Sequence, residues 1–141
     1  MQINKDLRVT DGAYYNLDLD TIAKNGIYST DEIVVGRWID GKPIYRKVYY
    51  NGNYSQAAKS TKDISFSLPN FKTLVSAYGS ITAGDGVFNE FPIPWANATG
   101  MEYSASFGGI TSTGFKITTG SGTVWSNYKV YIVFEYTKIT D

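Results

Sequence analysis

The sequence predicts an all-β protein, an antiparallel β-sandwich of jelly-roll-like form. Aromatic residues make up 16% of the 141 residues and include 12 tyrosines, and such side chains favour strands over helices. Short apolar runs are separated by Gly, Asn, Ser and Pro at spacings typical of a sandwich. Because this length suits one hydrophobic core, we expect a single folded domain.

The clearest strand lies near the end of the sequence, over residues 128–137. There, apolar or aromatic side chains alternate with residues of mixed polarity. One face of this strand therefore belongs in a core, and the other suits solvent or the rim of a subunit contact. The residues of the core face are Tyr128, Val130, Ile132, Phe134 and Tyr136.

A first hairpin is expected from two β-rich runs, residues 33–39 and 44–50. Because proline lacks an N–H, the intervening residues 40–43 need a loop slightly longer than a two-residue turn. Pairing of the two runs would bring Arg37 near Arg46, and both would then need a carboxylate or water partner. The hairpin is interpreted as architectural, with Trp38, Asp40, Gly41 and Tyr45 as its structural residues.

Further along, the turn Gly120-Ser121-Gly122 has apolar residues on both sides, which predicts a second hairpin. Other strands are expected around residues 64–68, 71–78 and 101–107. Residues 84–100 are interpreted as a long loop, in which two prolines disfavour a central strand. The first thirty residues are less regular and predict a short helix or an extended arm.

Composition excludes several classes of function. Thirteen basic and thirteen acidic residues balance, without a basic run that would bind nucleic acid. The sequence contains no apolar stretch of 18 residues, so no membrane-spanning segment is expected, and no secretory signal is readable. The sequence lacks His and Cys, which removes the usual catalytic triads and His- or Cys-ligated metal sites. We therefore expect neither an enzyme nor a cofactor.

Carboxylates are the remaining groups with catalytic or metal-binding potential. Paired acids could hydrolyse a glycosidic bond, but we interpret the candidates as solvated charge: Asp85, Glu90 and Glu102. Asn16, Asp18 and Asp20 could supply oxygen ligands to calcium. The sequence around them lacks the complete loop that calcium sites of this kind use, so no metal is expected there.

Aromatic residues beside loop signals favour a saccharide-binding surface, because an aromatic face stacks on a sugar ring while polar neighbours bind its hydroxyls. Trp95 lies in the proline-flanked loop and is the preferred binding residue, with Tyr103 and Asp85 as companions. The alternative for Trp38 and Trp125 is that they fill the core or a subunit seam.

Two segments resemble one known family. Residues 28–49 read YSTDEIVVGRWIDGKPIYRKVY, and residues 125–141 read WSNYKVYIVFEYTKITD. Both resemble stretches in the C-terminal domains of bacteriophage tail-fibre, baseplate and receptor-binding structural proteins. The resemblance brackets an appendage domain over residues 28–141 and leaves residues 1–27 as an N-terminal arm or attachment segment.

This resemblance implies a virion protein, a tail-fibre or baseplate tip domain that recognises a host cell-surface saccharide. It also implies a homotrimer. We expect contacts to other virion proteins through the N-terminal arm, although residues 1–27 carry no recognised motif. An alternative is a head-fibre or decoration protein with a scaffold role and no receptor binding.

Overall fold

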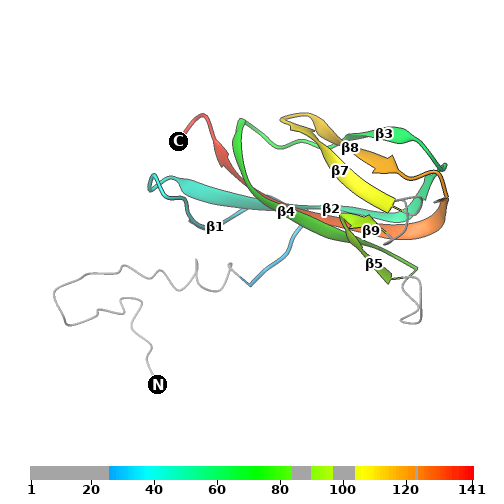
Figure 1. Ribbon diagram of the computed structural model, residues 1–141. Helices are drawn as coiled ribbons and strands as arrows, with labels where there is room; N and C mark the ends of the chain where they lie inside the picture. Colours follow the sequence, from blue (N-terminus) through cyan, green and yellow to red (C-terminus); the bar gives the residue numbers. More distant parts are fainter. Residues whose placement is uncertain (1–25, 84–89, 97–103, 123) are drawn as a thin grey trace, which may run out of the picture.

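The computed structural model describes residues 26–83, 90–96, 104–122 and 124–141. These residues form two antiparallel β-sheets packed face to face (Figure 1). The all-β sandwich expected from the sequence is therefore confirmed. In the described ranges there is no helix of the length and apolarity that crossing a membrane requires.

The larger sheet has five strands: β1 (Ile33–Arg37), β2 (Pro43–Gln56), β4 (Phe71–Thr82), β5 (Glu90–Ile93) and β9 (Trp125–Lys138). Their order across the sheet is β1-β2-β9-β4-β5. The three long strands, β2, β9 and β4, lie at the centre, and the two short strands form the edges. The strand closest to the C-terminus is thus the central strand of this sheet.

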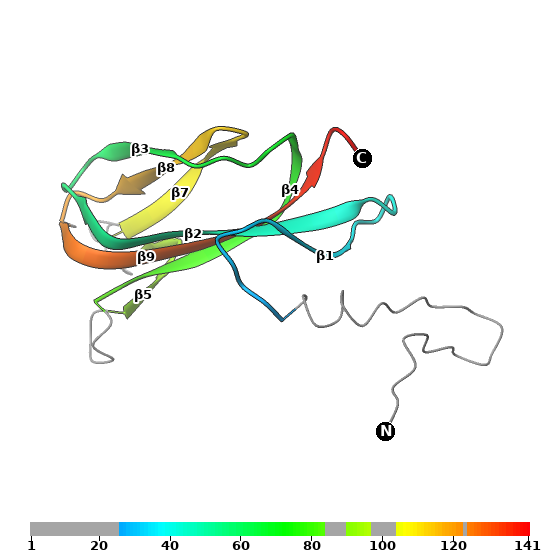
Figure 2. The same cartoon turned by 180° about the vertical axis from the view of Figure 1, so that it is seen from behind.

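The smaller sheet has four strands: β3 (Thr61–Ser65), β6 (Trp95–Ala96), β7 (Ser104–Thr111) and β8 (Gly114–Thr119). Their order is β3-β8-β7-β6. Both views show β3, β7 and β8 as a layer lying over the long strands of the larger sheet (Figures 1 and 2). The chain changes sheet after β2, β3, β5 and β8, so each layer is built from separate stretches of the sequence.

The core between the sheets is rich in aromatic side chains. Val130, Ile132, Phe134 and Tyr136 of β9 are each 0% exposed, so these positions confirm the core face predicted for this strand. Phe134 lies among several rings, and its ring centroid is 5.1 Å from that of Phe115 on the opposite sheet. Packing of these rings joins the two sheets.

The predicted hairpin around Gly120-Ser121-Gly122 is wrong. β8 and β9, which flank this segment, belong to different sheets, so residues 120–122 connect the layers instead of turning a hairpin. The hairpin in this region joins β7 to β8, with Thr111 paired to Gly114. A glycine-rich turn signal carries no information about which sheet the next strand joins.

The loop predicted over residues 84–100 is wrong in part, because β5 and β6 lie within it. Pro92 occupies β5, which is an edge strand, in agreement with the rule that a residue without an N–H avoids central strands. Residues 84–89 and 97–103 lie outside the described part of the chain, as do residues 1–25.

The first hairpin has the expected loop but a different register. Ile33 pairs with Arg46, and Arg37 pairs with Pro43, so the two arginines are not cross-strand neighbours as predicted. The Arg37 guanidinium donates to the Gly41 carbonyl at 2.8 Å. A bulge between Val34 and Gly36 shifts the register, and sequence alternation alone does not locate such a bulge.

The loop of this hairpin is held by its own backbone. The Trp38 N–H donates to the Lys42 carbonyl at 2.8 Å, and the Gly41 N–H donates to the Trp38 carbonyl at 2.9 Å. The Asp40 carboxylate accepts from the Lys42 N–H at 3.0 Å. Gly41 has a φ of 80°, which residues with a Cβ rarely adopt.

Candidate functional site

A groove of about 350 Å³ lies on the smaller sheet, beside the turn between β7 and β8. Its lining combines charged side chains, hydroxyls and glycine backbone, above two apolar residues of the core. The lining residues are Asp63, Ile64, Ser65, Gly109, Thr111, Thr113, Gly114, Phe115 and Lys116. We refer to it as the β3–β8 groove.

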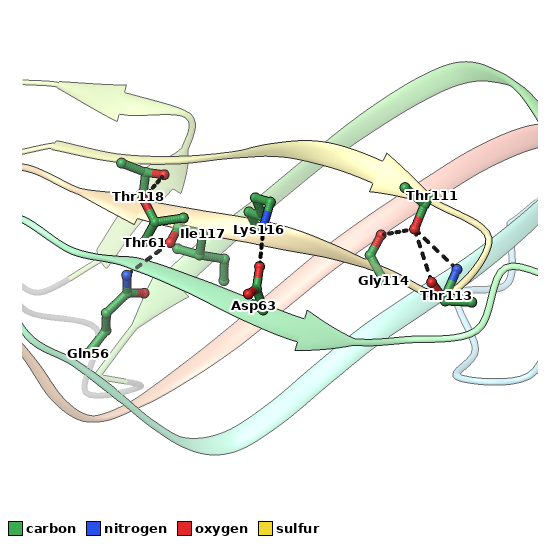
Figure 3. Close-up of polar contacts among 9 residues, drawn as sticks. All are labelled: Gln56, Thr61, Asp63, Thr111, Thr113, Gly114, Lys116, Ile117 and Thr118. Carbon is green, nitrogen blue, oxygen red and sulfur yellow. Dashed lines mark hydrogen bonds and ion pairs between the residues drawn. The ribbon is translucent and has the colours of Figure 1, made fainter.

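Strand register brings the two charges of the groove together. Asp63 of β3 pairs directly with Lys116 of β8, and the Lys116 ammonium donates to the Asp63 carboxylate (Figure 3). The Asp63 side chain is 81% exposed and the Lys116 side chain is 53% exposed. Both charged groups can therefore exchange their mutual contact for contact with a ligand.

Hydroxyls lie on either side of this pair. At the turn, Thr111 Oγ1 donates to the Gly114 carbonyl at 3.2 Å and accepts from the Thr113 N–H at 3.3 Å. Beyond the ion pair, the Thr61 and Thr118 hydroxyls share a hydrogen bond of 3.1 Å. Figure 3 shows these groups following one another along the paired strands, so polar atoms of several kinds lie along one face.

Two glycines permit the backbone geometry of the groove. A Cβ on Gly114 would lie 2.2 Å from the Ile64 carbonyl oxygen, so the close approach of β3 and β8 requires glycine there. Gly109 has a φ of 58°, a left-handed conformation that glycine adopts without a Cβ penalty. Below the groove, Ile64 and Phe115 are 8% and 3% exposed, so the floor is packed core.

Trp95, the preferred binding residue from sequence, does not line the β3–β8 groove. It lies on β6 and pairs with Ala105. Its half-buried ring is 4.7 Å from Phe91, whose ring is in turn 5.3 Å from Trp125. These rings form a seam between β5 of one sheet and β6 of the other, which gives Trp95 a packing role.

The other predicted binding residues, Tyr103 and Asp85, lie outside the described residues. The same holds for Glu102, for the Glu90 side chain and for the proposed calcium ligands before residue 26. Within the ranges that the structure describes, His, Cys, Asp and Glu form no group of three that could hold a metal ion. Of the two remaining tryptophans, Trp125 is buried in the core and Trp38 is half-exposed.

A second surface of interest is the outer face of the larger sheet. Tyr50 and Tyr131 stack there with ring centroids 4.9 Å apart. The Tyr78 hydroxyl donates to the Tyr28 hydroxyl at 3.2 Å, and burial, followed by this bond, raises the pKa of Tyr78 to about 12. All four tyrosines are at least 38% exposed. We call this surface the tyrosine face.

An ion pair lies beneath the tyrosine face. Arg46 of β2 donates to Glu135 of β9 through Nη2 at 3.0 Å and through Nε at 3.2 Å. The guanidinium also lies 4.5 Å from the centre of the Tyr28 ring and donates to the Ile27 carbonyl. The sequence predicts that Arg46 needs a carboxylate or water partner, and in the structure this partner is Glu135. The sequence did not identify which carboxylate it would be.

Sequence reasoning did not select the residues of the β3–β8 groove. Asp63 and Lys116 are far apart along the chain and belong to no motif; β-sheet register alone makes them neighbours. A usable signal is the polar alternation of the two short strands, which places Thr61, Asp63 and Ser65 on one face. Comparison with models of protein families, with curated proteins and with solved structures gives no match.

Proposed function

We propose that the chain is a non-enzymatic structural module of a bacteriophage particle, a tail-fibre or baseplate tip domain that binds a host cell-surface saccharide. The observation that supports this best is the meeting of the two segments that resemble such proteins. Residues 28–49 contain β1 and the first half of β2, and residues 125–141 contain β9. β2 and β9 pair in antiparallel fashion, from Tyr45 opposite Tyr136 onward.

Paired strands that share a resemblance form one structural unit. If the resemblance were accidental, its two segments would have no reason to be neighbours in the fold. Here they form three adjacent strands of the larger sheet, while the smaller sheet and its turns carry no recognised motif. This division suits a framework that resembles such proteins and displays a binding surface of its own.

The β3–β8 groove supplies such a surface. It offers a carboxylate, an ammonium group and threonine hydroxyls within one concave region, and hydroxyl-rich ligands bind through groups of this kind. A single shallow site of this size binds weakly, and several copies on one particle would raise the avidity.

Saccharide binding is tested by titrating the protein with purified wall and capsular polysaccharides from a panel of bacteria in a calorimeter. We expect heat of binding with a subset of these polymers, and adsorption of the protein to the bacteria that produce them. Failure to bind any of the polymers, together with failure to adsorb to any of the cells, would refute the receptor-binding function.

We also propose that the protein assembles as a homotrimer, and the tyrosine face supports this. Tyrosine is enriched at protein interfaces because its ring is apolar and its hydroxyl can bind water or a partner. Light scattering on a sizing column measures the native mass. Three chains are expected, and Tyr131→Arg should reduce the mass toward one chain, whereas a monomeric parent protein would refute the trimer.

The tyrosine face also favours the second candidate, a head-fibre or decoration protein that contacts other virion proteins without binding a receptor. In that case the exposed rings would be covered by another protein of the particle. Two observations together would favour the scaffold function over receptor binding. One is that substitution of Tyr50 and Tyr131 prevents incorporation of the protein into phage particles. The other is that particles without the protein adsorb to the host as well as complete particles do.

A further inference from the structure

The geometry of the β3–β8 groove points to a specific ligand class: we propose that it binds one neutral pyranose ring through two adjacent hydroxyls that bridge Asp63 and Lys116. This inference rests on the proposed saccharide-binding function and adds the binding geometry, the number of sugar rings and the charge of the sugar. Of the aromatic binding candidates that the structure describes, Trp38, Trp95 and Trp125, none lines the groove.

The charges of the groove favour a neutral ligand. Asp63 can only accept hydrogen bonds and Lys116 can only donate them, whereas a sugar hydroxyl does both. Two adjacent hydroxyls can therefore donate to Asp63 and accept from Lys116 at the same time. Because the two side chains already neutralise each other, an uncharged ligand leaves the charge balance intact.

Charged sugars fit less well. The carboxylate of a uronic acid would gain contact with Lys116 but would lie beside the Asp63 carboxylate, and the like charges repel at this separation. An amino sugar would meet the same difficulty at Lys116. The pair thus selects against either sign of charge.

The turn extends the site beyond the ion pair. Thr111 uses its hydroxyl to hold the turn, through the Gly114 carbonyl and the Thr113 N–H. Thr113 is exposed, and the hydrogen bond described for its hydroxyl is to Thr111 Oγ1 at 3.3 Å. Thr113 is therefore placed to give a third polar contact without loss of the turn.

The volume of the groove and the open surface beside it agree with binding of a single sugar ring. A volume of about 350 Å³ is near the lower limit for small-molecule sites, roughly 300 to 1,000 Å³. Gly108 pairs with Lys116, and a Cβ built on Gly108 meets no atom within 4 Å. The space over Gly108, beside Lys116 on the side away from Asp63, is therefore open, and a sugar ring held by the ion pair can extend over the backbone there.

Three variants test the site with little risk to folding. Asp63→Asn removes the charge and keeps the shape, Thr113→Val removes the hydroxyl, and Gly108→Val fills the open space beside Lys116. The matched control is Asp31→Asn, the same chemical change at an exposed position just before β1 of the other sheet. Equal urea midpoints for parent and variants show that each variant is folded.

Binding of the methyl glycosides of glucose, galactose, mannose and glucuronic acid is measured by calorimetry or by saturation-transfer NMR. We expect at least one neutral glycoside to bind, and the glucuronide to bind about tenfold more weakly than the glucoside. Asp63→Asn should weaken neutral binding by about tenfold, as for the loss of one hydrogen bond to a charged group. Gly108→Val should weaken it by a similar factor, because its side chain fills the space over which the ring extends. Thr113→Val should cause a smaller loss, and Asp31→Asn should cause none.

Two results would overturn the inference and leave the proposed function intact. One is polysaccharide binding that Asp63→Asn and Gly108→Val do not change, which would locate the sugar site elsewhere. The other is tighter binding of the glucuronide than of every neutral glycoside. Absence of binding to all polysaccharides and all glycosides would instead refute both the inference and the proposed saccharide-binding function.

Discussion

Glu135→Gln removes the negative charge from the ion pair that joins β2 to β9. Arg46, the partner, is only 6% exposed, and the Glu135 side chain is 18% exposed. The substitution keeps the size of the side chain and one hydrogen-bond acceptor. It therefore removes the carboxylate that forms the described ion pair with a buried guanidinium, while changing packing very little.

The magnitude follows from the geometry. At 3.0 Å between Arg46 Nη2 and Glu135 Oε1, Coulomb attraction with an effective dielectric constant of about 20 is about 5 to 6 kcal/mol. Removal of one partner from a fully buried pair costs about 3 to 5 kcal/mol. Because Glu135 retains some solvent contact and glutamine still accepts a hydrogen bond, we expect a loss of about 2 to 3 kcal/mol.

Urea unfolding followed by tryptophan fluorescence measures this loss. With a slope of about 2 kcal/mol per molar urea for a domain of this size, the midpoint should fall by roughly 1 M. The exposed pair of Asp63 and Lys116 is the matched control, since Asp63→Asn should change the free energy of unfolding by less than about 0.5 kcal/mol. An equal effect of the two substitutions would refute the reasoning from burial.

A double substitution separates charge from packing. Arg46→Met together with Glu135→Leu removes both charges and keeps apolar volume, so it should recover most of the stability that Glu135→Gln loses. If the double variant is instead less stable than Glu135→Gln alone, the interactions of the pair stabilise the fold by more than the free energy lost when its two charges are removed from water. The bonds of Arg46 to the Ile27 carbonyl and its contact with the Tyr28 ring would then account for the difference.

Three further predictions concern stability. Burial is the largest cause that raises the pKa values of Tyr45 and Tyr78 from 10.0 to about 12; the unfolded chain therefore loses these protons first, and the urea midpoint should fall as the pH rises from about 10 to 12. Gly79→Ala would place a Cβ 2.1 Å from the Tyr131 carbonyl oxygen and should lower the free energy of unfolding by at least about 2 kcal/mol in the urea assay. An unchanged urea midpoint would contradict this close approach. Phe134→Ala empties a 0% exposed position and should lower the thermal midpoint through a loss of about 3 to 5 kcal/mol; a loss below about 1 kcal/mol would contradict the packing described for this ring.

The sequence predicted the strands whose patterns are local. The alternation from Tyr128 to Tyr136 marks a face that must be buried, and this strand occurs as β9. The β-rich runs on both sides of residues 40–43 occur as β1 and β2. In both cases the information lies within about ten consecutive residues, the range over which side-chain alternation acts.

What the sequence did not predict depends on contacts between distant residues. The strand after Gly120-Ser121-Gly122 could have returned to β8 or crossed to the other sheet, and the same turn residues permit both. The groove depends on Asp63 meeting Lys116, which the register of β3 against β8 determines. The prolines around Trp95 also gave no indication of its contact with Phe91, whose ring lies 4.7 Å away at a tilt of 48°.

The place of β9 in the larger sheet affects how the domain is made. This strand is the last one along the sequence, yet it separates β2 from β4. While the ribosome is still synthesising residues before Trp125, the nascent chain holds two long strands with no strand between them. The larger sheet therefore cannot be completed before β9 has been translated, and until then the edges of β2 and β4 that face β9 lack their pairing strand.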